Sequence, residues 1–380
     1  RNEKNVRESV HTSFLVCLIA GFLMLALGLI FARPLLELLN TREDLIDGAE
    51  LYLRIYFLGM VFNLVYNMGA GILRAVGDSK RPLYFLIFST LLNVVLDFLF
   101  VVGLGLGANG AAIATILCQA VSAVLVMFTL MRSDDVYRVR LRELRFSLPI
   151  LRDIVRIGLP AGLQSVIYNI SNIIVQSTIN GFGTNVIAAW TANGKIDGIF
   201  WMIMGAFGTA TTTFSGQNFG AQKYDRIRRS VRVCLALGFG SAVLMSVLYC
   251  SLAPYLLGLF TRDAEVVSIG LDMVRQLVPY YFTYVCIEIL AGAARGCGCS
   301  LAPMLMTCGG VCVLRVAWIF ILLPLRPELS TVLVSYPASW VFTSVLFIFY
   351  YLQGGWLRGR IRKMGYAPEE RGRKKEAGAH

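Results

Sequence analysis

The chain has 380 residues, of which 57% are apolar and 15% are charged, and its mean hydropathy is +0.67. In soluble globular domains about a quarter of all residues are charged, so this composition excludes an ordinary water-soluble domain. The formal net charge of +12 does not indicate a nucleic-acid partner, because the basic residues gather in connections between apolar runs.

Long apolar runs recur from one end of the chain to the other. Each run is close to the roughly 20 residues that a helix needs to cross a bilayer, and too long and unbroken for a barrel strand. Backbone groups in hydrocarbon must be satisfied within their own segment, so the sequence predicts an all-α integral membrane protein. The ten predicted spans are 12–32, 48–73, 82–104, 110–131, 157–180, 186–214, 230–253, 268–294, 302–324 and 331–352.

The basic residues predict the orientation of these spans. Most of the 35 Lys and Arg lie in one set of alternate connections, and the opposite set holds only Arg33, Arg42, Arg262 and Arg326. Basic loops remain on the cytoplasmic side of a membrane. We therefore expect both ends of this chain in the cytoplasm and the protein in a plasma membrane, the inner membrane of a bacterium.

Two short polar elbows between apolar runs repeat one another about 221 residues apart. The matching residues are Arg74 and Arg295, Gly77 and Gly298, Ser79 and Ser300, and Pro82 and Pro303. Glycine permits a tight elbow and proline begins the next helix, so we interpret these residues as architectural. The two arginines can bind the last carbonyls of a helix or phosphate headgroups.

The repeat predicts two related lobes. We assign 1–132 to an incomplete amino-terminal lobe of four helices and 133–154 to a cytoplasmic inter-lobe linker. A carboxy-terminal lobe of six helices follows over 155–356, and 357–380 is interpreted as a basic, disordered cytoplasmic tail. The second half has two helices before the point that aligns with Arg1, so the symmetry predicts ten of an expected twelve helices.

The span 82–104 contains an amide and a carboxylate one helical turn apart, Asn93 and Asp97. A carboxylate inside a bilayer has an insertion cost of about 2.5–3.5 kcal/mol at a helix centre, so Asp97 should face the protein interior. Hard oxygen ligands suit Na⁺, and a desolvated carboxylate suits a proton. The alternative is that Asp97 lies near the outer end of its helix and pairs locally.

The carboxy-terminal half holds a second set of polar residues that could line a substrate cavity. A polar stripe at spacings of four suits a cavity wall or interhelical hydrogen bonds. Lys195 and Asp197 must reach different partners, in a cavity or in a structural ion pair. Glu288, beside Tyr284, could hold an organic cation or could bond Arg315. The predicted cavity residues are Gln164, Tyr168, Asn172, Gln176, Lys195, Asp197, Tyr284 and Glu288.

At the two elbows, at the run Leu92–Asp97 and at Gly158-Leu159-Pro160, the chain resembles the multidrug and toxic compound extrusion (MATE) family. The resemblance runs from Arg1 to about Leu352. It implies two six-helix lobes and an antiport in which an organic, often cationic, compound leaves the cell as Na⁺ or H⁺ enters. It also implies a cation site at positions that match Asn93, Asp97 and Thr115. The acidic residue of other members on the seventh helix is replaced by Tyr168, so coupling through the amino lobe is favoured.

We therefore predict a monomeric, cation-coupled exporter of small organic compounds that works by alternating access. A flippase for lipid-linked saccharides or peptidoglycan precursors remains an alternative, with Arg54, Arg275 and Arg315 as possible pyrophosphate ligands. A third alternative is an intramembrane enzyme or a scaffold. The chain has no G-x-x-x-x-G-K-[ST] loop and only two histidines, so we expect no ATP-driven pump, no enzyme, no bound metal and no cofactor besides the coupling ion.

Overall fold

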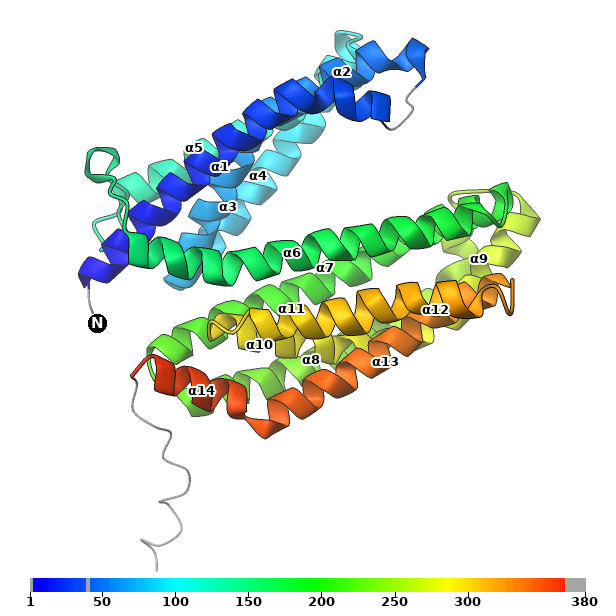
Figure 1. Ribbon diagram of the computed structural model, residues 1–380. Helices are drawn as coiled ribbons and strands as arrows, with labels where there is room; N and C mark the ends of the chain where they lie inside the picture. The colour runs from blue at the N-terminus through cyan, green and yellow to red at the C-terminus, as the bar shows by residue number, and fades with distance from the viewer. Residues whose placement is uncertain (1–2, 39–41, 366–380) are drawn as a thin grey trace, which may run out of the picture. The chain divides into compact units, whose positions relative to one another are not determined.

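The computed structural model describes residues 3–38 and 42–365, and every regular element within these ranges is helical (Figure 1). The chain divides into two compact units, Arg1–Val155 and Arg156–His380. The helical elements confirm the predicted all-α fold, and the division lies beside residue 154, where the predicted linker ends. Each unit is described by itself below.

The first unit contains four membrane-length helical segments. The segments are α1 (Glu3–Leu38), α2 (Glu43–Leu58) with α3 (Met60–Ala75), α4 (Lys80–Asp97) with a π-helical turn (Phe98–Gly103), and α5 (Gly107–Arg132). Helix α3 packs against both α1 and α5, and α4 packs against α5. Phe14, Leu73, Val126 and Leu130 lie buried in the core between them. The four helices predicted for this lobe are therefore present.

The segment predicted as the inter-lobe linker is bound to α1 of the first unit. The Thr12 hydroxyl on α1 donates to the Arg145 carbonyl oxygen at 3.3 Å and accepts from the Ser147 N–H at 3.1 Å. His11 Nε2 accepts from the Arg140 N–H at 3.3 Å. The next helix begins at Leu148, within the range of 133–154 predicted for the linker. Polar backbone groups of the connection after α5 are satisfied by side chains of α1. The sequence pattern does not reveal this pairing.

The second unit contains six long helical segments and one short helix. The elements are α6 (Leu148–Asn180), α7 (Thr184–Gly220), α8 (Tyr224–Gly258), α9 (Ala264–Leu277), η3 (Val278–Tyr284), α10 (Val285–Gly296), α11 (Leu301–Thr307), η4 (Cys308–Val313), α12 (Leu314–Leu322), α13 (Leu329–Gln353) and α14 (Gly355–Lys363). Pro279 lies in the 3₁₀ turn η3, where the α-helical ladder is interrupted as its missing N–H requires.

Small residues allow α7 and α10 to approach closely. A Cβ atom on Gly292 would lie 2.9 Å from the Gly208 carbonyl oxygen, and one on Gly216 would lie 3.1 Å from the Gly296 carbonyl oxygen. The seam glycines are four residues apart on α10 and eight apart on α7, and small residues of this kind are usual where helices pack in lipid. The largest core cluster of the described chain surrounds this seam, with Phe200, Tyr281 and Trp340 among its buried rings.

The two predicted elbows have the same backbone geometry. In the first, the Asp78 N–H bonds the Leu73 carbonyl at 2.9 Å and the Gly77 N–H bonds the Arg74 carbonyl at 3.1 Å. The second repeats both bonds at equivalent positions, from Cys299 to Ala294 and from Gly298 to Arg295, each at 2.9 Å. This is a Schellman motif, which needs a left-handed residue, and Gly77 and Gly298 have φ values of +99° and +81°. The repeat is therefore structural.

Eight helices of the described chain are long and apolar enough to cross a membrane, whereas the sequence predicted ten spans. All ten apolar runs lie within helices, and the two that are not among the eight are α6 and α7. These helices have 33 and 37 residues, so their length is sufficient. They carry the predicted polar stripe and the pair Lys195 and Asp197, which lower their hydropathy.

The start of the predicted disordered tail is a helix. Helix α14 buries Trp356, Leu357 and Ile361 against the second unit, and Arg360 Nε donates to the Cys297 carbonyl at 3.2 Å. The carboxy lobe therefore extends beyond 356, and the tail prediction for 366–380 lies outside the described residues. Burial under α14 raises the pKa of the Cys297 thiol to about 12. That thiol is consequently protonated and unreactive.

Candidate functional site

The polar residues of the first unit gather on one seam between α4 and α5. The hydroxyls of Ser89 on α4 and Ser122 on α5 share a hydrogen bond. One turn further along α4, the Asn93 side chain lies beside the buried Cys118 thiol, and the Asp97 carboxylate is close enough to influence the same thiol. The residues on each helix are three or four positions apart, so they share one helix face.

Two atoms on this seam are buried and have no hydrogen-bond partner. They are Oδ1 of Asp97 and Nδ2 of Asn93. Asp97 also forms no ion pair within the described residues, and its helical segment continues for six residues to Gly103, about 9 Å at the helical rise. The described residues give the Oδ1 atom no local partner, and the cation site at Asp97 stays a prediction. A buried carboxylate oxygen without a partner is an acceptor that a cation could satisfy.

Thr115 lies one turn from Cys118 on α5, on the side that leads toward Asp97. Its hydroxyl donates to the Ala111 carbonyl at 2.9 Å, so its proton is already used within its own helix. The oxygen retains lone pairs that can accept a hydrogen bond or contact a cation. The seam thus brings the three predicted cation-coupling residues to adjacent turns of two packed helices.

The sequence analysis missed two further polar positions of the first unit. Cys118 lies beside Asn93 on the seam, and Asn109 at the start of α5 has a buried Oδ1 without a partner among the described residues. Cys118 could have been found, because it is three residues from Thr115 and faces the same helix. Nothing in the sequence distinguishes Asn109 from an ordinary polar residue at a helix start.

In the second unit, the polar stripe of α6 has mixed surroundings. Gln164 and Tyr168 are half-buried and Asn172 is exposed. Gln176 accepts from the Trp190 indole N–H at 3.0 Å and donates to Asn180 at 2.9 Å. Gln176 therefore joins α6 to α7 by an interhelical hydrogen bond, which is the second of the two interpretations. A cavity wall stays a prediction for the other three residues.

Lys195 and Asp197 point in different directions, as their spacing requires. Lys195 is exposed, whereas the Asp197 carboxylate accepts a hydrogen bond from the Tyr281 hydroxyl. Tyr281 stacks on Phe200 at a centroid distance of 4.1 Å, inside the core of the unit. Asp197 has no ion-pair partner in the part of the chain that the structure describes.

Glu288 lies at the other side of this aromatic core. Its Oε1 is 3.1 Å from Nη2 of Arg295, and its Oε2 accepts from the Tyr284 hydroxyl at 3.4 Å. Arg295, and not the Arg315 of the structural interpretation, therefore pairs with the Glu288 carboxylate. The two residues are seven positions apart, so α10 places them on one face two turns apart. Lys195, Asp197, Tyr284 and Glu288 keep their cavity role as a prediction.

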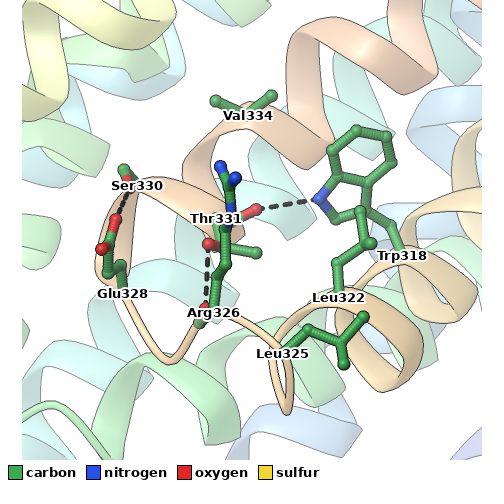
Figure 2. A pocket seen from close by; sticks show the side chains of 8 residues that line it. All are labelled: Trp318, Leu322, Leu325, Arg326, Glu328, Ser330, Thr331 and Val334. Carbon is green, nitrogen blue, oxygen red and sulfur yellow. Dashed lines mark hydrogen bonds between the residues drawn. The ribbon is translucent and has the colours of Figure 1, made fainter.

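The pocket drawn in Figure 2 lies away from all predicted site residues. It has a volume of about 390 Å³ and lies at the turn between α12 and α13. Figure 2 shows Trp318 donating to the Thr331 carbonyl at 3.0 Å and Ser330 bonding Glu328. These bonds tie the turn together. The pocket is therefore a feature of a helix connection, and no predicted residue lines it.

The relatives of the chain are consistent with this architecture. The chain is 27% identical over 376 residues to the probable multidrug resistance protein YoeA of Bacillus subtilis, covering 96% of this chain and 80% of that protein. It is 21% identical over 380 residues to the probable multidrug resistance protein NorM of Thermotoga maritima, covering 96% and 81%.

Solved structures show the same fold. A MOP superfamily transporter from Pyrococcus furiosus superimposes with a TM-score of 0.87 at 22% identity, over 92% of this chain and 79% of that one. An outward-facing multidrug resistance MATE family transporter gives a TM-score of 0.85 at 23% identity, over 91% and 78%. The MatE family model matches residues 1–99 and 160–321, one stretch in each unit. This multi-pass membrane protein belongs to the MatE family.

Proposed function

We propose that this protein is an antiporter that exports small organic compounds across the plasma membrane in exchange for Na⁺ or H⁺. Family membership and relatives named as multidrug resistance proteins support export of organic compounds. Both ends of this chain would lie in the cytoplasm, as the distribution of basic residues indicates. The two lobes would alternate access to a substrate, as expected for transporters built from repeats.

The observation that carries the proposal is the buried, unpartnered Oδ1 of Asp97. Asn93 and Thr115 offer a carbonyl and a hydroxyl oxygen on the same seam, so the seam supplies the hard oxygen ligands that Na⁺ prefers. An unpaired carboxylate in the membrane interior also suits a proton, because proton relays in transporters are built from such groups. Ion binding would favour one lobe shape and substrate would favour the other.

The test is ion-driven efflux by the Asp97→Asn variant in proteoliposomes. We expect the flux driven by a Na⁺ or pH gradient to fall at least tenfold in this variant, because the amide has no negative charge with which to bind the ion. Asp47→Asn is the matched control, since Asp47 is an exposed carboxylate of the same unit that contacts Arg33 at 3.3 Å. Equal flux in Asp97→Asn and the wild type would contradict the site.

The flippase alternative has less support. Of its three candidate arginines, Arg54 pairs with Glu50 at 2.6 Å and Arg275 pairs with Asp272 at 3.3 Å. Only Arg315 remains without a carboxylate partner in the described residues. One relative, 25% identical over 278 residues, is an FAD transporter of Shewanella oneidensis, covering 70% of this chain and 60% of that protein. The substrate class is therefore open within the proposed activity.

A further inference from the structure

Arg315 on α12 is a buried cation in the middle of the second unit. Its side chain belongs to a residue that is only 1% exposed. A guanidinium remains charged at every physiological pH, so it cannot escape burial by losing a proton. A buried charge is expensive unless it is paired, and a charge inside a membrane segment is a functional-site candidate.

The contacts of Arg315 do not neutralise it. Its Nη2 donates to the Ser339 hydroxyl oxygen at 3.3 Å, and its Cζ lies 3.9 Å from the centroid of the Tyr336 ring. The Tyr168 hydroxyl of α6 lies beside the guanidinium. Each of these groups is formally neutral. The Nε atom of Arg315 is buried and has no hydrogen-bond partner.

Two acidic groups on helices of the same unit have other partners. Glu288 of α10 forms its ion pair with Arg295 at 3.1 Å, and Asp197 of α7 accepts from Tyr281. Arg315 forms no ion pair within the residues that the structure describes. The titratable or charged groups that face this interior from the packed elements are Tyr168, Asp197, Tyr284, Glu288, Arg295, Cys312 and Tyr336.

A second buried donor without a partner lies close by. The indole N–H of Trp340 on α13 has no acceptor, and this residue is also 1% exposed. The Trp340 ring lies 5.8 Å from the Tyr336 ring on which Arg315 stacks. Ser171 on α6, one turn from Tyr168, has a buried hydroxyl without a partner as well. Three helices thus present unsatisfied donors, and buried donors require acceptors.

We propose that the interior of the carboxy-terminal lobe binds a singly charged anionic group at Arg315. Arg315 Nε supplies the charge-assisted hydrogen bond, and Trp340 Nε1 and the Ser171 hydroxyl are further donors on the neighbouring helices. One uncompensated cation calls for one negative charge. The group is either a free halide or the carboxylate of a molecule that enters the lobe. This binding site does not depend on the proposed transport activity.

The opposing explanation is that Asp197 serves as the counter-charge at a distance. Asp197 and Arg315 are both close enough to Tyr336 to influence its hydroxyl. If that interaction were sufficient, the lobe would have no affinity for an external anion. The two explanations therefore differ in one measurable property, which is the response of the purified protein to anions.

The experiment compares thermal unfolding of the purified protein in chloride and in gluconate at constant ionic strength. We expect the unfolding midpoint of the wild type to rise with chloride concentration and to saturate, because a ligand that binds the native state stabilises it. Arg315→Met should show no such rise, and in gluconate it should be at least as stable as the wild type. Replacing an unpaired buried ion by an apolar side chain removes the desolvation penalty. Arg275→Met, at an exposed arginine, should respond as the wild type does.

A second measurement keeps the inference testable if Arg315→Met folds poorly. Iodide should quench part of the tryptophan fluorescence of the wild type saturably, through Trp340, and Trp340→Phe should lose that part. Benzoate and methyl benzoate then separate the sources. Competition with iodide by benzoate but not by its ester assigns the group to a carboxylate, and no competition assigns it to a free anion. The absence of any saturable response to chloride or iodide in the wild type would overturn the inference.

Discussion

Thr115 is the ligand candidate whose chemistry is simplest to isolate. Its hydroxyl proton is used by the Ala111 carbonyl, so only its oxygen could serve a bound cation. Thr115→Val retains the shape and removes this oxygen. We expect about a tenfold rise in the ion concentration needed for half-maximal efflux, equivalent to about 1.4 kcal/mol of lost binding. Thr115→Ser keeps the oxygen and should behave as the wild type; an unchanged ion dependence in Thr115→Val would exclude the ligand role.

Gln176 separates a structural role from a cavity role. Its side chain accepts from the Trp190 indole at 3.0 Å and joins α6 to α7. Gln176→Leu should lower the free energy of unfolding by about 1 kcal/mol, as measured for hydrogen bonds between membrane helices. It should leave the apparent affinity for exported compounds unchanged. Asn172→Leu on the same stripe is the control, because Asn172 is exposed and should not affect stability. A changed affinity in Gln176→Leu with wild-type stability would favour the cavity wall.

Residue roles were predictable from the sequence only where the partner lies on the same helix or follows from the spacing. Asn93 and Asp97 share a face at four-residue spacing, and the structure keeps them together on one seam. The partner of Glu288, Arg295, lies seven residues further along the same helix, and the sequence analysis overlooked it. The partner of Gln176 was not predictable, because Trp190 lies on another helix and the packing of α6 against α7 is not encoded in local periodicity.

At the scale of elements, the elbows provide a matched pair of substitutions. Gly77 and Gly298 both have positive φ, so alanine at either position should cost about 1–2 kcal/mol of backbone strain. A Cβ on Gly77 meets nothing within 4 Å, whereas one on Gly298 would lie 2.8 Å from Nη2 of Arg360. We therefore expect Gly298→Ala to lower the unfolding midpoint more than Gly77→Ala does. Thermal unfolding of the purified variants measures both changes.

The comparison between the two elbows has its own control. In an Arg360→Ala background the guanidinium is gone, so the additional cost of Gly298→Ala should disappear while the strain remains. The double variant thus separates the cost of the contact with α14 from the cost of backbone strain. Substitutions at residues in contact are not additive, and the deviation measures their interaction. If Gly298→Ala and Gly77→Ala cost the same in the wild type, α14 does not press on the elbow.

The existence of the helices was predictable, whereas several of their ends were not. Ten apolar runs became helices because their length and hydropathy leave no other way to satisfy the backbone in lipid. Helix α14 was misread as tail, since its nine residues hold four basic side chains and only three buried apolar ones. The helical conformation of this segment depends on its packing against the rest of the second unit, because short helices are not stable alone.

At the scale of the whole molecule, the duplication is the feature that the sequence predicts best. The elbows repeat their hydrogen bonds at equivalent positions, and the MatE family model matches once in each unit. The units nevertheless differ in their interior chemistry. Among the described residues, the first has an unpartnered carboxylate oxygen on α4, and the second has a guanidinium on α12 that no carboxylate pairs with. Pseudo-symmetry of the backbone therefore does not extend to charge.

The central claim is that an ion bound beside Asp97 is coupled to the cargo. The most direct measurement is the dissociation constant of a transported organic cation for the purified protein, with and without saturating Na⁺ or across a pH range. We predict that the ion weakens cargo binding at least fivefold and that cargo weakens ion binding by the same factor, since coupling between sites is reciprocal. The Asp97→Asn variant should bind cargo with the same affinity with and without Na⁺ and at every pH. Cargo affinity in the wild type that is independent of both ions would contradict the account.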